Sequence, residues 1–353
     1  MKMRTRLIAF VSICSTLLQL SSLLPAVAGV AGVAGLAAVA EHTDEQLSRK
    51  LNFPVYVWSN GTTPPQAVII AIHGMTLHGR RFDTIAQHLA DNNYCVVATD
   101  LRGFGDRQEL PLNKDGRTAV HYKLSESDMM SLVRAAKTQY GATKVYCMGE
   151  SLGANLAIDL AAKNPDLING VMACSPCVKL TTDFSPRTIR DVVKAFIHPY
   201  RPISVKPYVA DKLSEDKRVV ESYLGDPLVR TTLSAPELLK SLGANKHALT
   251  SIGLLPSEMP LLIIAGEKDR IYDSHSLLSF VSKSSSHRTQ LQIESNLGHL
   301  LIEHAFVKPE VLAAIDVWLA AQASTVATGG TQSQDGSADK PAAHGISQTS
   351  HAL

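Results

Sequence analysis

A short motif in the middle of the chain, Gly149-Glu150-Ser151-Leu152-Gly153, restricts the fold more than any other feature. The mostly apolar residues 144–148 before it predict a buried strand, and residues 154–162 after it predict a helix. The two glycines allow a sharp turn between strand and helix without a Cβ clash. Such a turn raises the Ser151 hydroxyl above the sheet, beside the free N–H groups at the start of the helix. The motif therefore predicts a sheet covered by helices, with a serine displayed at a strand end.

The chain also supplies an acid and a base where they would activate this serine. Residues 260–265 predict a buried strand, and Asp269 follows it on a loop. Residues 290–294 alternate polar and apolar side chains, as an edge strand does, and His299 follows on the next loop. A serine hydroxyl becomes a strong nucleophile when a histidine takes its proton and an acid orients that histidine. We therefore predict the catalytic triad Ser151, Asp269 and His299.

Each triad residue has a simpler interpretation when it is taken alone. Asp269 would suit a turn, His299 the protein surface, and Ser151 the start of a helix. Their order along the chain and their places after strands favour the triad. Asp273, four residues after Asp269, is the alternative acid. Glu150 holds a position of the turn that normally points away from the reacting atoms, so we assign it no catalytic role.

The loop after the apolar residues 68–72 is the predicted source of oxyanion stabilisation. These residues predict a central parallel strand, which ends at His73-Gly74-Met75. In a sheet of this kind one N–H donor comes from that loop and the other from the residue after the serine. Those donors are the backbone N–H groups of Met75 and Leu152. We expect the His73 ring to bind nearby backbone and to shape the loop.

Several segments taken together resemble the α/β-hydrolase fold, and within it the branch of monoacylglycerol lipases, lysophospholipases and serine aminopeptidase-like enzymes. The resemblance covers residues 51–321. It lies in the serine motif and in Ala71-Ile72-His73-Gly74, Asp100-Leu101-Arg102-Gly103-Phe104-Gly105, Gly266-Glu267-Lys268-Asp269 and Gly298-His299. The segment Asp226-Pro227-Leu228-Val229-Arg230 resembles a phrase of the cap region in that branch. The resemblance implies an α/β-hydrolase fold and serine hydrolase chemistry.

The chain differs from these relatives at one position that bears on the site. Asp106 stands where the branch commonly has a serine after the Asp-x-Arg-Gly-x-Gly phrase, and we expect a changed loop at the rim of the cleft. The nucleophile is a serine rather than an aspartate. That argues against the haloalkane dehalogenase and epoxide hydrolase relatives, which attack through a carboxylate.

Strands and helices alternate along residues 41–322, which predicts one α/β domain with a mostly parallel sheet and helices on both faces. Residues 53–58 predict an early antiparallel strand. Helices are expected at 80–92, at 125–140 with Ser125 or Ser127 as the N-cap, at 273–282 and at 309–321. Residues 176–257 interrupt the alternation and predict a cap over the site, with helices near 188–196, 216–223 and 235–242.

The environment of the apolar cap residues stays open at this point. They either pack the cap on itself, or form an acyl-chain pocket or a surface that meets lipid aggregates. The residues are Phe184, Ile189, Val192, Val193, Phe196, Ile197, Tyr200 and Tyr208.

Residues 1–40 have the pattern of a targeting segment. A basic start is followed by an uncharged apolar stretch, with candidate cleavage sites at Ala26-Val27-Ala28 and Ala38-Val39-Ala40. An uncleaved membrane anchor is the alternative, although glycines and a proline favour a cleaved signal peptide. Both place the catalytic domain outside the cytoplasm, in a periplasm or secreted. The polar residues 323–353 predict a disordered tail.

The charge, the metal-binding residue types and the cysteines of the chain limit the partners, cofactors and disulfides that we expect. The formal net charge is +2 and no block of Lys or Arg stands out in the body of the chain, so nucleic acid is not expected. No cluster of metal ligands accompanies the triad, so no metal or organic cofactor is expected. Cys95 and Cys147 fall in predicted buried strands, so we expect them to be free thiols that pack as small apolar side chains. Cys174 and Cys177 form a C-x-x-C pair, for which a local disulfide is an alternative to free thiols.

These features predict an exported serine hydrolase that cleaves carboxylic esters through an acyl-enzyme on Ser151. The resemblance implies monoacylglycerols, lysophospholipids or similar small lipid esters as substrates, and contact with a membrane surface would fit such substrates. An amidase or peptidase and an acyltransferase on the same triad are the alternatives. A catalytically silent binding protein is another, because a fold does not imply a function. The presence of all three triad residues favours an enzyme.

Overall fold

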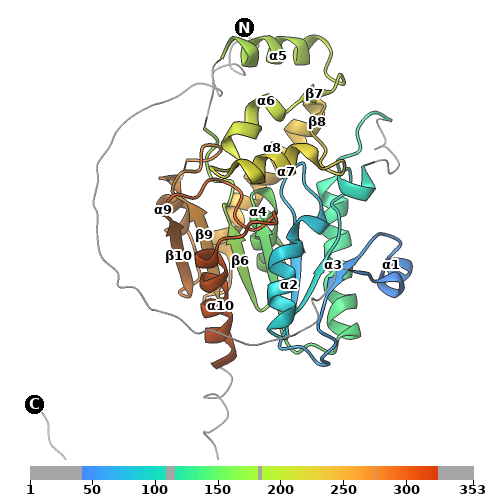
Figure 1. The fold of residues 1–353 in the computed structure, drawn as a ribbon, viewed down its shortest axis with the longest axis vertical. Helices are drawn as coiled ribbons and strands as arrows, with labels where there is room; N and C mark the ends of the chain where they lie inside the picture. Colours follow the sequence, from blue (N-terminus) through green and yellow to red (C-terminus); the bar gives the residue numbers. More distant parts are fainter. Residues whose placement is uncertain (1–41, 109–115, 182–184, 274, 325–353) are drawn as a thin grey trace, which may run out of the picture. The chain divides into compact units, whose positions relative to one another are not determined.

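Eight strands form one mixed sheet in the computed structural model, which describes residues 42–108, 116–181, 185–273 and 275–324 (Figure 1). The strand order is β1-β2-β4-β3-β5-β6-β9-β10. The strands are β1 (His42–Thr43), β2 (Tyr56–Trp58), β3 (Val68–Ile72), β4 (Cys95–Ala98), β5 (Val145–Glu150), β6 (Gly170–Cys174), β9 (Leu261–Gly266) and β10 (Thr289–Glu294).

The pairing of the strands confirms the predicted fold class. β1 and β2 are antiparallel, as expected for the early strand, and the strands from β4 through β10 pair in parallel. The prediction that β10 lies at an edge is confirmed as well. Parallel strands end at the same edge of a sheet, so the loops after β3, β5, β9 and β10 meet there. This is the arrangement of the α/β-hydrolase fold.

Helices cover both faces of the sheet. Alternate strand residues face α3 (Tyr122–Gln139) and α4 (Leu152–Lys163) in one apolar cluster. The others face α2 (Asp83–Asp91) and α10 (Pro309–Ser324) in a second cluster. The period-2 alternation of a strand sends successive side chains to opposite faces, so each central strand serves both clusters. The two helix layers can be followed in Figure 1.

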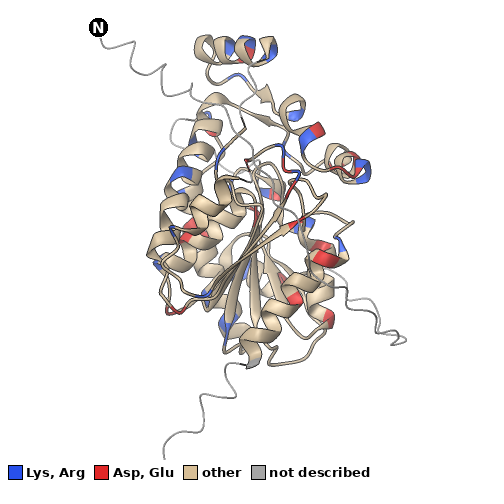
Figure 2. Ribbon diagram, turned by 90° about the vertical axis from the view of Figure 1, so that its left-hand side faces the viewer, with Lys and Arg blue, Asp and Glu red and all other residues tan. Residues whose placement is uncertain are grey.

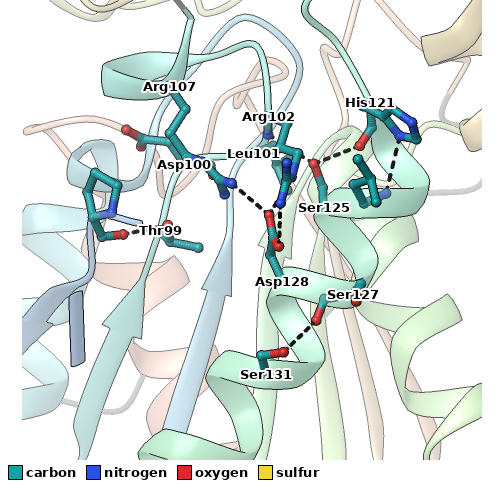
Figure 3. A network of polar contacts seen from close by, with 12 residues as sticks. Thr99, Asp100, Leu101, Arg102, Arg107, His121, Ser125, Ser127, Asp128 and Ser131 are labelled. Carbon is teal, nitrogen blue, oxygen red and sulfur yellow. Dashed lines mark hydrogen bonds and ion pairs between the residues drawn. The ribbon is translucent and has the colours of Figure 1, made fainter. Parts of the chain in front are cut away.

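Helix α3 begins earlier than expected. Its N-cap is His121, whose Nδ1 accepts the Leu124 N–H, rather than Ser125 or Ser127. The Ser125 hydroxyl instead donates to the His121 carbonyl and accepts the Arg102 N–H (Figure 3). Ser125 is therefore occupied inside the helix, where it fixes the segment that follows β4.

A mostly helical cap lies between β6 and β9 in the chain. It contains α5 (Pro186–Ile197), β7 (Ile203–Ser204), α6 (Lys206–Val209), α7 (Lys217–Gly225), β8 (Thr232–Leu233) and α8 (Ala235–Ser251). The expected end of α8 near residue 242 is wrong by about two and a half turns, because the helix continues to Ser251. Gly243 is a poor helix former, but the packing of α8 against α4 carries the helix across it.

The remaining helices are short or terminal. α1 (Glu45–Leu51) precedes β2, and α9 (Ser276–Val281) falls within the expected helix at 273–282. α10 ends at Ser324, so the first two residues of the expected tail are helical. The predicted leader at 1–40 and the rest of the tail lie outside the described residues. Among the described helices, none combines the length and the apolar character needed to cross a membrane.

Candidate active site

Ser151 lies on a strained turn between β5 and α4. Its φ is 57° and its ψ is −123°, a conformation that a residue with a side chain rarely adopts. The flanking glycines are needed for space. A Cβ on Gly153 would lie 1.9 Å from the Ile72 carbonyl oxygen, and one on Gly149 would lie 2.4 Å from the Gly153 carbonyl oxygen. The motif therefore works as predicted, because the turn packs directly against the end of β3.

The structure brings Ser151, His299 and Asp269 together. His299 Nε2 lies 2.9 Å from Ser151 Oγ, and His299 Nδ1 lies 2.7 Å from Asp269 Oδ2. Asp269 Oδ1 accepts the N–H groups of Ile271 and Tyr272, at 2.8 and 2.9 Å. Asp269 accepts from Nδ1–H, which leaves Nε2 free to take the serine proton.

The alternative acid lies elsewhere. The Asp273 carboxylate accepts the His275 N–H and the Ser276 hydroxyl at the approach to α9. Lys179 lies 3.7 Å from the same carboxylate. Asp273 thus belongs to a local turn, and only Asp269 contacts His299.

Charges within the triad lower the pKa of Asp269 and raise the pKa of His299. Burial disfavours the ionised Asp269, but the charge and hydrogen bond of His299, together with two N–H donors, hold the pKa of Asp269 below its ordinary value. Burial disfavours protonated His299, but the Asp269 charge and hydrogen bond outweigh it and raise the pKa of His299. The pair is therefore set to stabilise the imidazolium that forms when His299 takes a proton.

The two expected oxyanion donors lie beside this serine. Neither the Met75 nor the Leu152 N–H donates a hydrogen bond to another group in the described part of the chain. The Gly74 carbonyl, which shares a peptide group with the Met75 N–H, accepts from His73 Nδ1–H at 2.7 Å. A trans peptide holds its C=O and N–H in opposite directions, so this bond also aims the Met75 N–H.

His73 has the structural role that was expected of it. Its Nε2 accepts the Leu101 N–H at 2.8 Å, which requires the proton to be on Nδ1. Burial lowers the pKa of His73 to about 4, so the ring stays neutral. A neutral ring of one fixed tautomer holds the oxyanion loop against the segment after β4.

Two buried carboxyl groups beneath the site were not predicted as site residues. Glu303 accepts the Gly74 N–H through both oxygens, at 3.0 and 3.1 Å. Glu150 accepts the N–H groups of Leu301, Ile302 and Glu303. The sequence contains one signal for them, since each glutamate adjoins a run of buried apolar residues where an unpaired charge would be costly.

Cys177 and Tyr272 also border the triad. Cys177 Sγ lies 3.3 Å from Ser151 Oγ, and the Tyr272 ring packs against His299 with 5.4 Å between centroids. Cys174 and Cys177 are both free and buried, so the alternative of a local disulfide is wrong here. Cys95 and Cys147 are free and buried as predicted. Burial raises the pKa of Cys177 to about 12, which keeps a neutral thiol beside the serine.

Asp106, for which a changed loop at the rim of the cleft was expected, belongs to a small polar network. The Tyr56 hydroxyl lies 2.8 Å from the Asp100 carboxylate and 3.0 Å from the Asp106 carboxylate, so the two carboxylates share its single proton. Asp106 also pairs with Arg80 at 3.1 Å, and Asp100 accepts the Gly79 N–H. The departure from the relatives' serine thus joins the segment after β4 to the loop after β3.

The cap contacts both catalytic loops. The Leu213 carbonyl accepts the N–H groups of His299 and Leu300, at 2.9 and 2.8 Å. On the other side, the Arg230 N–H donates to the Thr76 carbonyl, just beyond Met75. Among the described residues, no group of three or more His, Cys, Asp or Glu side chains could hold a metal ion.

The chain is similar in sequence to known monoacylglycerol lipases. Human monoglyceride lipase is 26% identical over 273 residues, which cover 76% of this chain and 86% of the human protein. Monoacylglycerol lipase of Mycolicibacterium smegmatis is 26% identical over 264 residues, which cover 74% of this chain and 89% of that protein.

Solved structures share the fold. The monoacylglycerol lipase of Paleococcus ferrophilus superimposes with a TM-score of 0.59 at 22% identity, covering 76% of this chain and 98% of that one. A soluble variant of the Saccharomyces cerevisiae monoglyceride lipase, in complex with a substrate analogue, superimposes with a TM-score of 0.61 at 18% identity. The match covers 79% of this chain and 92% of that one. A family model described as Serine aminopeptidase, S33, matches residues 63–304. The protein therefore belongs to this family of α/β-hydrolases.

Proposed function

We propose that the protein hydrolyses carboxylic esters through an acyl-enzyme on Ser151. The observation that carries the proposal is the continuous relay from Ser151 Oγ through His299 to Asp269, at 2.9 and 2.7 Å, beside two unused N–H donors. Ser151 Oγ attacks the ester carbonyl while His299 Nε2 takes the hydroxyl proton. The Met75 and Leu152 N–H groups stabilise the oxyanion. In related enzymes the loss of one such donor raises the activation free energy by about 2.7–4 kcal/mol.

Collapse of the first tetrahedral intermediate breaks the bond between the acyl carbon and the alcohol oxygen, and His299 gives its proton to the departing alcohol, which leaves the acyl-enzyme. Water then attacks the acyl-enzyme while His299 Nε2 takes one of its protons. When this second intermediate collapses, His299 passes that proton to Ser151 Oγ and the carboxylic acid departs. No step needs a cofactor.

Small lipid esters, such as monoacylglycerols or lysophospholipids, are the proposed substrates. The relatives named monoglyceride lipase support this choice, since they cover most of the catalytic domain. The cap supports it too. Helix α5 has no buried residue and exposes an apolar set along its length: Ile189, Val192, Val193, Phe196 and Ile197.

We further propose that α5 contacts the lipid aggregate that holds the substrate. Phe196 is 88% exposed, which is unfavourable in water but suits insertion among acyl chains. Arg187, Arg190 and Lys194 lie on the same helix, which is at the top of the molecule in Figure 2. Basic residues next to an apolar face favour anionic surfaces. The exposure of these five apolar residues supports the lipid-facing alternative for them, whereas Phe184 lies outside the described residues.

Export from the cytoplasm remains a proposal based on residues 1–40. It is supported by the basic start, the apolar stretch and the two candidate cleavage sites. Cell fractionation with mass spectrometry of the mature N-terminus tests it. A new N-terminus after Ala28 or Ala40 in the exported fraction supports a signal peptide. Full-length protein in the membrane fraction supports an anchor, and full-length protein in the cytosol contradicts both.

A chain-length series of p-nitrophenyl esters tests the catalytic proposal, with Ser151→Ala run in parallel. The wild type should turn over and react with a fluorophosphonate probe, whereas Ser151→Ala should do neither while keeping its fold. Activity retained in Ser151→Ala would refute the assignment. Probe labelling without ester turnover would indicate an amidase or acyltransferase on the same triad, and no labelling would indicate the silent binding protein.

A further inference from the structure

The main chain of Gly74 is held on both sides of its Cα. On the C-terminal side, His73 Nδ1–H binds the Gly74 carbonyl at 2.7 Å. On the N-terminal side, the Gly74 N–H donates to both oxygens of Glu303, at 3.0 and 3.1 Å. The next N–H along the chain belongs to Met75, the oxyanion donor. Its direction therefore depends on two side chains, of which Glu303 comes from the loop beyond the catalytic histidine.

Space around Gly74 is filled by the same groups. A Cβ at this position would lie 3.0 Å from Glu303 Oε2 and 3.3 Å from both the Glu150 carbonyl oxygen and Ser151 Cβ. The oxyanion loop thus rests directly on the nucleophile turn and on the Glu303 carboxyl group. A shift of Glu303 would move the loop relative to Ser151.

Glu303 is itself fixed by a second carboxyl group. Glu150 Oε2 accepts the Glu303 N–H at 2.9 Å, and the Glu150 carboxyl group also accepts the N–H groups of Leu301 and Ile302. Arg81 Nε donates to the Glu303 carbonyl from the other side, at 3.1 Å. Glu150 precedes the nucleophile, so one buried cluster joins the nucleophile turn, the histidine loop and the oxyanion loop.

We propose that Glu303 is a positioning residue for the oxyanion hole, which fixes Gly74 from behind the loop while Glu150 holds the segment that carries it. This inference rests on the proposed serine hydrolase function and adds a group that does not touch the substrate. Both carboxyl groups are fully buried. A protein retains such groups at a stability cost only where their hydrogen bonds are satisfied, as they are here by main-chain N–H groups.

The expected protonation of the Glu150 and Glu303 carboxyl groups fits a positioning role. Burial raises the pKa of Glu150 to about 7. Burial and the neighbouring Glu150 charge raise the pKa of Glu303 well above its ordinary value. We expect the pair to retain a proton near neutral pH, because two buried carboxylates in one cluster repel each other. The cluster then holds three loops without placing two negative charges beneath a developing oxyanion.

The test compares Glu303→Gln and Glu303→Leu with the wild type on a p-nitrophenyl ester. Active sites are counted with a fluorophosphonate so that loss of folded protein is removed from the rates. Gln keeps one acceptor oxygen for the Gly74 N–H, so we expect kcat of Glu303→Gln to fall roughly tenfold. Leu keeps no acceptor, so we expect kcat of Glu303→Leu to fall roughly 100-fold. KM should change little in either variant. Asp128→Asn is the matched control, since it removes a buried charge from α3 that pairs with Arg102 and Arg107.

A trifluoromethyl ketone separates positioning from general damage. It adds to Ser151 and places an oxyanion in the hole, so its inhibition constant should rise in step with the loss of kcat/KM across the Glu303 variants. Asp128→Asn should lower the melting temperature and leave this constant unchanged. Folded Glu303 variants with an unchanged inhibition constant would overturn the proposal. A wild type that the fluorophosphonate does not label would instead overturn the proposed function.

Hydrogen exchange of the wild type decides the matter if neither variant folds. The Gly74 N–H, bound to a buried carboxyl group, should exchange far more slowly than an open loop amide. Exchange at the open-loop rate would refute the hydrogen bond to Glu303 and, with it, the positioning role.

Discussion

The Leu213 carbonyl of the cap accepts the His299 N–H at 2.9 Å, so the cap is hydrogen-bonded to the main chain of the catalytic histidine. The loop before His299 and the cap segment at Leu213 also pack closely against each other. A Cβ on Gly298 would lie 2.9 Å from Ser214 Cα and 3.2 Å from the Leu213 carbonyl oxygen. The cap segment at Leu213 and Ser214 is thus part of the support for His299.

Gly298→Ala should therefore impair catalysis without unfolding the protein. The added methyl group would meet main-chain atoms of Leu213 and Ser214, which cannot move aside as a flexible side chain does. It must therefore displace His299 or the cap segment. A misplacement on the order of 1 Å costs about 100-fold in rate, and we expect a loss between about tenfold and 100-fold in kcat/KM. Steady-state kinetics on a p-nitrophenyl ester measures it, and a rate equal to the wild type would show that the cap backbone is free to move.

Gly243→Ala is the control for the same substitution at a site without contacts. A Cβ there meets nothing within 4 Å, and Gly243 lies inside α8. Alanine should stabilise the helix by roughly 0.8–1 kcal/mol and raise the melting temperature by a few degrees. Its kcat/KM should equal that of the wild type, and a loss of activity would show that α8 dynamics affect catalysis.

The choice between Asp269 and Asp273 is testable by paired substitutions. Asp269→Asn removes the carboxylate that holds His299 Nδ1–H, so the ring can adopt the wrong tautomer, and kcat should fall about 10⁴-fold. Asp273→Asn changes only the turn before α9 and should keep kcat within about twofold. Equal losses in both variants would show that the turn at 273 is needed to hold the acid.

The triad could be predicted because strand patterns are local. The runs that became β5, β9 and β10 are readable from apolar periodicity, and a parallel sheet brings the loops after them to one edge. Ser151, Asp269 and His299 are each within a few residues of a strand end. Their meeting follows from topology alone, without knowledge of side-chain packing.

Glu303 could not be predicted in the same way. It meets Gly74 across 229 positions of the chain, and no local pattern reports which buried donor a carboxyl group will find. The start of α3 was missed for a related reason, because Ser125 hydrogen-bonds to Arg102 from another segment. The helix near 188–196 and its apolar residues could be predicted from the sequence, but whether the rest of the cap covers these residues depends on tertiary packing.

The pH profile should report the ionisation of His299. Only the neutral ring can take the Ser151 proton, and the Asp269 charge raises the pKa of His299 above its ordinary value of 6.5. Activity should therefore rise with pH, with kcat/KM on a neutral ester reaching half of its plateau above pH 6.5. A midpoint below pH 6.5 would mean that burial outweighs the Asp269 charge in the free enzyme.

Substitution of Phe196 tests whether α5 serves lipid contact. Phe196→Ser removes an apolar side chain that is 88% exposed, so folding should be unaffected. If the side chain inserts among acyl chains, the loss of its burial weakens vesicle binding by roughly tenfold or more. KM for a monoacylglycerol in anionic vesicles should rise accordingly, while turnover of a short soluble ester should stay the same. Val317→Ser is the matched control, since Val317 is 71% exposed on α10. An equal effect of both substitutions, or none from Phe196→Ser, would show that α5 does not meet the lipid surface.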